Sequence, residues 1–276
     1  MTIAQWLRIA AQQLHDAGIP SARLDAELLL AHTIRKPRTW LHGHNNDPLE
    51  PRQLEIARAR LDLRLDRVPV AYIIGHKEFY GRAFKVTTAT LIPRPESEVL
   101  IELLDEALPK NERLIVERPL RLVDVGTGSG CLGITAKLEH PELEVTLSDI
   151  SRHALNVAED NANSLHAAVE FLQSDLLTSY PFSADILIAN LPYVDPEWDR
   201  SPETRHEPDT ALFAPNHGLA LIFDLLAQTK EKLTRGGTLI LEADPEQHAA
   251  IIKEAATYGL VLHAQRDYGL LFDKLT

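Results

Sequence analysis

The tetrapeptide Asn190-Leu191-Pro192-Tyr193 carries groups suited to chemistry on a planar nitrogen. It follows the apolar run "ADILIA", so these groups come directly after a predicted buried strand. Pro192 fixes its own φ and drives Leu191 toward an extended conformation, which holds the Leu191 carbonyl in one direction. The side chain of Asn190 adds a second acceptor, and Tyr193 offers a flat ring. Two acceptors facing one NH₂ group suit an amide or an exocyclic base amine.

The lone pair of such a nitrogen is delocalised, so the nitrogen is a poor nucleophile. In-line attack on a sulfonium methyl group requires that the nitrogen be oriented and that acceptors stabilise its developing positive charge. No strong base is needed before the attack. The structural alternative for the tetrapeptide is a strand end with a capping Asn and a terminating Pro.

A second candidate site is the glycine loop in "LVDVGTGSGCLGI", with Gly126, Gly128 and Gly130 between a predicted strand and a predicted helix. Glycines at this position permit positive φ and let a ligand approach backbone amides at a helix N-terminus. The loop is therefore predicted to bind a nucleotide. Its spacing leaves the nucleotide open, because Gly128, Gly130 and Gly133 also match the dinucleotide pattern G-x-G-x-x-G.

Carboxylates near the loop favour S-adenosylmethionine over NAD. Asp149, at the end of the second predicted strand of the series, suits ribose hydroxyls in either case. Asp124 precedes the first glycine by two residues and suits a cationic amino group, whereas Asp175 in "LQSDLL" suits an adenine edge. A loop cap or a surface charge is the alternative for each of these acids.

The elements that position these residues alternate between strand and helix from "LRLVDVG" to the C-terminal part of the chain. Continuous apolar strands in this order predict an α/β fold with an open, mostly parallel sheet and helices on both faces. Ligands of such sheets bind outside the carboxyl ends of the strands. Residues 2–65 instead show helical spacing, and "VPVAYIIGHKEFYGRAFKV" suits short strands or a hairpin. We expect a helical domain over 1–67, a β-hairpin linker over 68–92 and a catalytic domain over 93–276.

Composition limits the classes of protein that the chain can represent. The 276 residues are 45% hydrophobic and have a net charge of −12, which argues against a broad nucleic-acid footprint. The single cysteine, Cys131, excludes an internal disulfide and a thiolate metal cluster and is expected to be a small packed residue. The 12 histidines show no ligand spacing, so we expect no metal. The N-terminus lacks a secretory h-region and no apolar stretch is long enough to span a bilayer, so we expect a cytoplasmic protein without membrane contact.

Several segments together resemble one family, the glutamine methyltransferases that modify peptide chain release factors (the PrmC or HemK family). The resemblance covers nearly the whole chain and includes "RLDAELLLAH", "PVAYIIGHKEFYGRAFKV", "LVDVGTGSGCLGI", "NLPYV" and "EPDTAL". Its most specific part is "EFYG" with "LIPRPE" upstream of the glycine loop. The resemblance implies a Rossmann-like class I methyltransferase sheet with a small N-terminal helical domain. It also implies methyl transfer from S-adenosylmethionine to the side-chain amide of the glutamine in a Gly-Gly-Gln loop.

The resemblance also assigns roles to residues and to partners. Arg94 and Glu96 would help to close the pocket, the N-terminal helices would dock the body of the release factor, and we expect a monomer that makes no direct contact with nucleic acid. The residues expected to bind S-adenosylmethionine are Gly126, Thr127, Gly128, Ser129 and Gly130 at the methionine part, Asp149 at the ribose, Asp175 and Leu176 at the adenine, and Asn190. The residues expected to hold the glutamine and to support catalysis are Asn190, Leu191, Pro192 and Tyr193.

Two segments depart from the family pattern. Leu191 stands where the family usually has a second proline. Leucine keeps the backbone acceptor but is less rigid than proline, and the lost rigidity corresponds to about 0.4–1 kcal/mol. Asn-Leu-Pro-Tyr is also similar to the tetrapeptide of adenine methyltransferases that act on ribosomal RNA, so an adenine amino-group methyltransferase of RNA or DNA is the nearest alternative. The segment "FAPNHGL" differs from the family's glycine-rich loop. An NAD-dependent oxidoreductase and a non-catalytic binder of the translation machinery are the other hypotheses.

Overall fold

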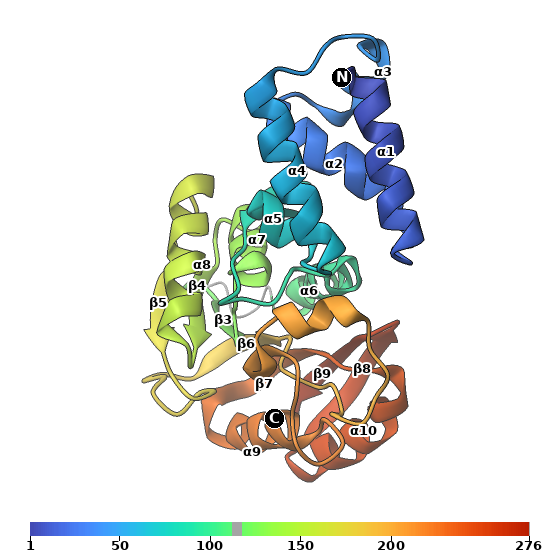
Figure 1. Ribbon diagram of the computed structural model, residues 1–276. Coiled ribbons are helices and arrows are strands. Elements are labelled where there is room, and N and C mark those ends of the chain that lie inside the picture. The colour runs from blue at the N-terminus through green and yellow to red at the C-terminus, as the bar shows by residue number, and fades with distance from the viewer. Residues whose placement is uncertain (112–117, 276) are drawn as a thin grey trace. The chain divides into compact units, whose positions relative to one another are not determined.

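The computed structural model describes residues 1–111 and 118–275, which divide into two compact units (Figure 1). Residues 1–76 and 201–206 form the first unit, and the other described residues form the second. The domain boundaries expected at residues 67 and 92 stay predictions. Within the described part, no helix is long and apolar enough to cross a membrane.

The first unit is helical, as its spacing predicts. Its helices are α1 (Ile3–Asp16), α2 (Ala22–Ile34), α3 (Arg38–Gly43), α4 (Pro51–Leu65) and α5 (Val70–Ile74). They enclose one apolar cluster that includes Trp6, Leu29 and Leu30. Helix α5 lies where the sequence suggested short strands. It is a single short helix that starts after Pro69 and ends at Gly75 with φ of +81°, so the hairpin begins only after it.

The predicted β-hairpin consists of β1 (His76–Phe79) and β2 (Arg82–Lys85). Tyr80 and Gly81 both have positive φ, which is the backbone conformation of the type I′ turn preferred by two-residue hairpins. Asn161 on α8 (Arg152–Leu165) pairs with both backbone groups of Lys85, and its amide also donates to the carbonyl of Ser129 at 2.8 Å. The hairpin is therefore joined to the glycine loop through one buried side chain.

The second unit contains a seven-stranded sheet in the order β5-β4-β3-β6-β7-β9-β8. Its strands are β3 (Arg121–Val125), β4 (Glu144–Asp149), β5 (Glu170–Gln173), β6 (Ala184–Ala189), β7 (Leu233–Glu242), β8 (Leu260–Arg266) and β9 (Gly269–Lys274). The first five strands of this order are parallel, and β9 runs antiparallel to both of its neighbours. The open, mostly parallel sheet predicted from the alternation of elements is confirmed.

Helices cover both faces of this sheet because its central strands are apolar on both sides. Ile186 and Ile188 of β6 pack into the cluster that contains α6 (Val99–Asn111), α7 (Cys131–Glu139) and α8. Leu187 and Ala189 of the same strand pack into the opposite cluster. That second cluster contains the helices α9 (Ala220–Lys232) and α10 (His248–Thr257).

The winding of the chain determines where a ligand can enter. From β3 the chain proceeds to β4 and β5 on one side, and β6 then returns to the other side of β3. The loops after β3 and β6 therefore diverge, and the crevice between them is the usual ligand site of a doubly wound sheet. Both motifs singled out in the sequence follow these two strands.

Candidate active site

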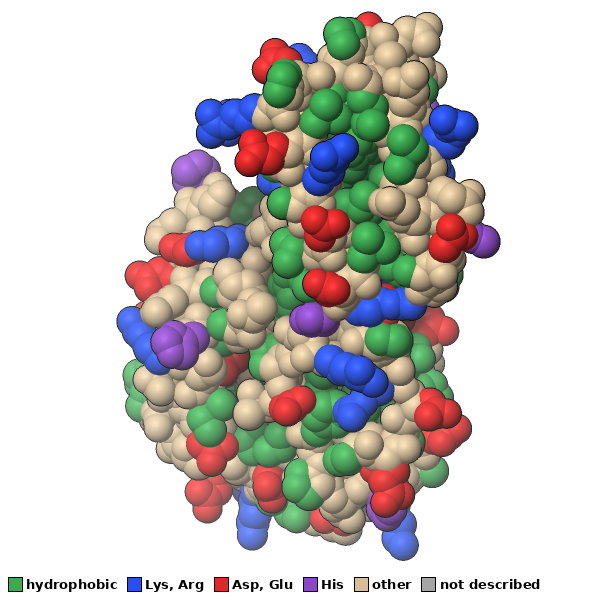
Figure 2. Space-filling view, in the orientation of Figure 1, with side chains coloured by type: hydrophobic (Ala, Val, Ile, Leu, Met, Phe, Trp, Pro, Cys, Tyr) green, Lys and Arg blue, Asp and Glu red, His purple; other side chains and the backbone are tan. Residues whose placement is uncertain are grey.

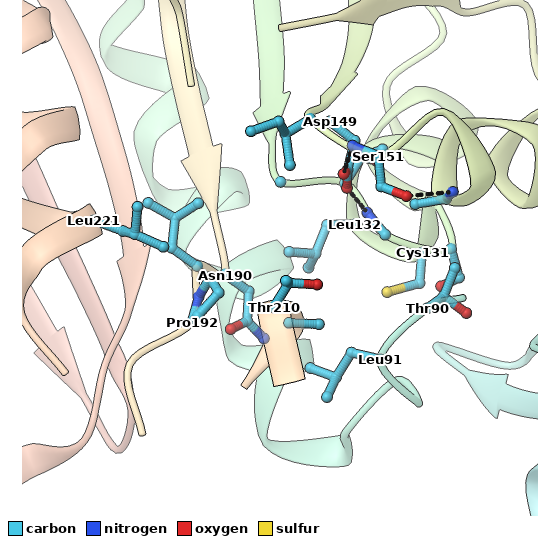
Figure 3. Close-up of a pocket in the computed structure, with 18 of the residues that line it drawn as sticks. Thr90, Leu91, Cys131, Leu132, Asp149, Ser151, Asn190, Pro192, Thr210 and Leu221 are labelled. Carbon is cyan, nitrogen blue, oxygen red and sulfur yellow. Dashed lines mark hydrogen bonds between the residues drawn. The ribbon is translucent and has the colours of Figure 1, made fainter. Parts of the chain in front are cut away.

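A cavity of about 350 Å³ lies at the carboxyl ends of the parallel strands (Figure 3). This volume falls within the range of pockets that hold small molecules. The loops after β3, β4, β5 and β6 all contribute to it, and so do the segments 89–97 and 210–213. The sheet thus brings the glycine loop and the tetrapeptide to one cavity, although about 60 residues separate them in sequence.

Most of the predicted site residues line this cavity. Those that line it are Gly126, Thr127, Gly128, Ser129, Asp149, Asp175, Leu176, Asn190, Leu191, Pro192 and Arg94. Gly130, Tyr193, Asp124 and Glu96 do not belong to the lining. The binding and catalytic roles of all these residues are proposals that rest on the geometry of the cavity.

The glycines of the loop after β3 serve different purposes. Gly128 has φ of +56°, and a Cβ placed on it would meet no atom within 4 Å. Its open side lets a ligand approach the backbone. Gly130 has φ of +83° and begins α7, and its Cβ would come within 2.7 Å of Ile134. Gly128 is thus needed for access and Gly130 for packing of the helix start.

Asp149 connects the end of β4 to the glycine loop. Its Oδ2 accepts from the backbone N–H of Gly128 at 2.9 Å, and its Oδ1 accepts from that of Ser151 at 2.8 Å (Figure 3). Burial raises the pKa of this carboxyl, and the backbone hydrogen bonds oppose that rise. The carboxylate is therefore fixed at the cavity wall, where its remaining lone pairs can accept from hydroxyl groups.

Asp124 lies behind the loop rather than on the cavity wall. It is fully buried, and its Oδ2 accepts from the Thr127 hydroxyl at 2.6 Å and the Gly133 N–H at 2.9 Å. Its Oδ1 has no hydrogen-bond partner in the described part of the chain, and burial raises the pKa of the carboxyl to about 6. Asp124 therefore shapes the loop from within.

The side chain of Asn190 reaches the cavity from the end of β6 (Figure 3). Its Nδ2 donates to Oγ of Ser97 at 3.0 Å, which leaves Oδ1 as the free acceptor of the amide. Leu191 packs against the glycine loop, since a Cβ on Gly126 would lie 2.9 Å from its Cδ2. The tetrapeptide and the glycine loop are thus in direct contact.

Tyr193 is placed differently from the other residues of the tetrapeptide. Its hydroxyl donates to Oε1 of Glu242 at 3.0 Å, and burial next to Glu242 raises the pKa of the phenol. Its backbone carbonyl accepts from Nε2 of Gln247 at 2.8 Å. The ring is half-buried behind the cavity wall, so the role expected for it as a flat contact for the substrate stays a prediction.

The sequence reasoning missed Ser97, Glu207 and Glu242. Glu242 ends β7, the strand beside β6, and is 1% exposed. Glu242 could have been recognised as a carboxylate at the carboxyl end of the strand that lies beside the tetrapeptide. Such recognition requires the order of the strands in the sheet. Glu207 lies in "EPDTAL", the segment already quoted for the family resemblance.

Glu207 fixes one wall of the cavity. Its buried carboxylate accepts from the Arg94 guanidinium at 2.5 Å and from the backbone N–H of Ile92 at 3.1 Å. Arg94 therefore bonds to the segment that supplies Thr210 and Phe213 to the lining. This ion pair is the structural basis for the closing role expected of Arg94.

Two other lining residues bear on the chemistry. Burial raises the pKa of the Cys131 thiol to about 12, so this thiol stays protonated and is no nucleophile at neutral pH. Ile150 directly follows Asp149 and is 63% exposed, which leaves an apolar surface at the cavity for a planar ligand group. Among the described residues, no group of His, Cys, Asp and Glu side chains is arranged to hold a metal ion.

Two family models match the chain. The model described as the PrmC N-terminal domain matches residues 5–75, and the methyltransferase small domain matches residues 96–205. Similar proteins include the release factor glutamine methyltransferase of Koribacter versatilis, 40% identical over 89% of each chain. That of Deinococcus radiodurans is 35% identical over 94% of this chain and 92% of its own length. That of Escherichia coli K12 is 34% identical over 98% and 96%.

Solved structures show the same fold at low sequence identity. A 16S rRNA N2 G1207 methyltransferase of T. thermophilus, in complex with AdoMet and guanosine, matches with a TM-score of 0.52 at 16% identity. The match covers 73% of this chain and 50% of that one. A methyltransferase from Pyrococcus furiosus matches with a TM-score of 0.51 at 14% identity over 79% and 98% of the two chains.

Proposed function

This chain belongs to the release factor glutamine methyltransferase family, and on that premise we propose that it methylates the glutamine side chain of a Gly-Gly-Gln loop in peptide chain release factors. The observation that carries the proposal is the contact between the two motifs. One cavity contains both a glycine loop open to a nucleotide and an amide oxygen free to accept from a substrate nitrogen.

S-adenosylmethionine supplies an electrophilic methyl group on a sulfonium. The residues present fit it. The open side of Gly128 admits the ligand to the loop backbone, and the Asp149 carboxylate suits ribose hydroxyls. Asp175 is exposed at the end of the cavity beyond β5, where its carboxylate suits the amino edge of adenine. Ile150 offers an apolar surface to the same ring.

The substrate glutamine enters beside Asn190. One N–H of its amide donates to Oδ1 of Asn190 and the other to the carbonyl of Leu191, which places the nitrogen lone pair toward the methyl group. Bound S-adenosylmethionine would supply the methyl group: the N–C bond to the glutamine would form as the S–CH₃ bond breaks, with the electron pair kept by sulfur. The positive charge that develops on nitrogen is stabilised by the two oxygens, and the nitrogen then releases one proton to solvent.

The protein partner follows from the same proposal. We infer that the N-terminal helical domain over 1–67 docks the body of the release factor and that the enzyme acts as a cytoplasmic monomer without direct contact with nucleic acid. Acidic and basic side chains are interspersed over the face seen in Figure 2, which supports the expected lack of contact with nucleic acid. The net charge of −12 repels a phosphate backbone.

The test is a methyl-transfer assay with labelled S-adenosylmethionine and three substrates in parallel. These are purified release factor, the same factor with its Gly-Gly-Gln glutamine replaced, and ribosomal RNA. We expect label on the intact factor alone. Label on RNA alone would establish the adenine methyltransferase alternative and would show that Leu191 marks an RNA-modifying site.

A further inference from the structure

Ser97, Tyr193 and Glu242 form a polar cluster next to the Asn190 side chain, and none of these three residues has a role in the reaction proposed for the cavity. Ser97 is 2% exposed and Glu242 is 1% exposed. Among the residues that the structure describes, Oε2 of Glu242 has no hydrogen-bond partner, although a buried carboxylate is costly unless its oxygens are satisfied. A costly buried group beside a reacting site requires a physical reason.

The hydrogen-bond donors of this cluster are directed toward Glu242 or toward a group that interacts with it. The Tyr193 hydroxyl donates to Oε1 of Glu242 at 3.0 Å. Burial raises the pKa of the Glu242 carboxyl, and hydrogen bonding by the Ser97, Tyr193 and Asn190 side chains opposes that rise, because these groups favour the ionised carboxylate as donors. Ser97 then has only a lone pair left for Asn190.

This direction determines which end of the Asn190 amide faces the cavity. Because Oγ of Ser97 accepts at 3.0 Å, the side of Asn190 that faces it must be the NH₂ group. Oδ1 is consequently presented to the substrate. The reverse orientation would set an NH₂ group against the NH₂ group of the substrate, which offers no acceptor to the target nitrogen.

We propose that Glu242 and Ser97 are positioning residues that fix the Asn190 amide with its oxygen toward the substrate nitrogen. The inference rests on the proposed function for its consequence in catalysis, but the orientation itself is a property of the free protein. Glu242 accepts from Tyr193 and interacts with the Ser97 and Asn190 side chains, and Ser97 accepts from the Asn190 amide. Glu242 is not part of the cavity lining, whereas Ser97 lines the cavity next to Asn190.

The kinetic test uses Glu242→Gln, which keeps the size of the side chain but adds a donor. With release factor as substrate we expect kcat to fall about 10- to 100-fold, the effect of misplacing one reacting partner. The dissociation constant of S-adenosylmethionine should stay within twofold. The matched control is Glu246→Gln, which removes an exposed carboxylate four residues away and should leave kcat unchanged.

A spectroscopic readout separates this proposal from the proposed function. The side-chain NH₂ signals of Asn190, identified by their loss in Asn190→Asp, should shift in Glu242→Gln and in Ser97→Ala but not in Glu246→Gln. This holds even if the enzyme proves inactive on release factors. If Glu242→Gln fails to fold, Ser97→Ala tests the same connection. Unchanged Asn190 signals together with a kcat within twofold of wild type would overturn the proposal.

Discussion

The backbone N–H of Gly128 donates a hydrogen bond of 2.9 Å to Oδ2 of Asp149, which joins the loop after β3 to the end of β4. The second oxygen of the same carboxylate accepts from Ser151 at the start of the next segment. Loop and strand end are therefore held in register before any ligand arrives. Such preorganisation reduces the free-energy cost of ordering the site when the cofactor binds.

Replacement of Asp149 should weaken cofactor binding more than it weakens the fold. In Asp149→Asn one acceptor oxygen becomes an NH₂ group, which cannot accept from a backbone N–H, and the negative charge that strengthens a hydrogen bond from a ribose hydroxyl is lost. Hydrogen bonds to charged groups contribute about 1.5–3 kcal/mol, so we expect the dissociation constant of S-adenosylmethionine to rise at least tenfold in calorimetric titration. Asp224→Asn, at an exposed position on α9, is the control and should bind like wild type. Equal affinity in both variants would contradict the role of Asp149.

Two glycine substitutions should separate binding from stability. A Cβ at Gly128 meets no atom, but φ of +56° places the residue in the left-handed region, which costs about 1–2 kcal/mol for an L side chain. Gly133 has ordinary φ, but its Cβ would lie 2.2 Å from Leu147 and 2.9 Å from Asp124.

We therefore expect Gly128→Ala to fold and to bind S-adenosylmethionine weakly, because its methyl group points into the open space of the cavity. Gly133→Ala should lose several kcal/mol of unfolding free energy through overpacking, as seen in chemical denaturation. Normal cofactor affinity in a well-folded Gly128→Ala would show that the ligand does not approach this backbone.

The sheet could be predicted from the sequence because each strand can be recognised from the pattern of its own residues. "LRLVDVG" and "ADILIAN" are apolar on both faces, and only a strand covered by helices on both sides satisfies that pattern. The placement of Tyr193 and Glu242 could not be predicted in the same way. Their hydrogen bond depends on β7 lying beside β6, and pairing between strands separated by 43 residues is not encoded in any local pattern.

The conformation of short elements also could not be predicted from the types of their residues. Val70–Ile74 is rich in β-branched and aromatic residues, and its helical conformation arises from the Pro69 start and the Gly75 end. Pro95 occupies the first position of a 3₁₀ turn, Pro95–Glu98, that leads into α6. That turn is what presents Ser97 to Asn190.

The buried carboxyl of Asp124 should make stability depend on pH. Its pKa rises from an ordinary value of 3.8 to about 6 in the folded protein, so the folded state holds the proton more tightly than the unfolded state. The contribution to stability is fully present below about pH 4 and is lost as the pH rises through about 6. A shift of this size corresponds to about 3 kcal/mol.

Asp124→Asn removes this titration. We expect the unfolding free energy of the variant relative to wild type to increase by up to about 3 kcal/mol between pH 4 and pH 7 in urea denaturation. The exposed variant Asp224→Asn should show no such trend. A constant difference across this range would mean that the Asp124 carboxyl titrates normally.

The ion pair of Arg94 and Glu207 should hold the cavity wall in place. Arg94→Ala removes the cationic partner of the buried Glu207 carboxylate and leaves it the hydrogen bond from the Ile92 N–H. Because Arg94 itself is about one-third exposed, we expect a loss of about 1–2 kcal/mol rather than the larger value of a fully buried pair. A double-mutant cycle with Glu207→Gln measures the coupling. Additive effects of the two changes would show that the pair does not stabilise the wall.

The most direct test of the central claim is tandem mass spectrometry of release factor after incubation with the enzyme and S-adenosylmethionine. The account predicts one added methyl group on the side-chain amide of the Gly-Gly-Gln glutamine, and none when Asn190→Ala replaces the wild-type enzyme. A methyl group on a different residue of the factor, or equal methylation by wild type and Asn190→Ala, would contradict it.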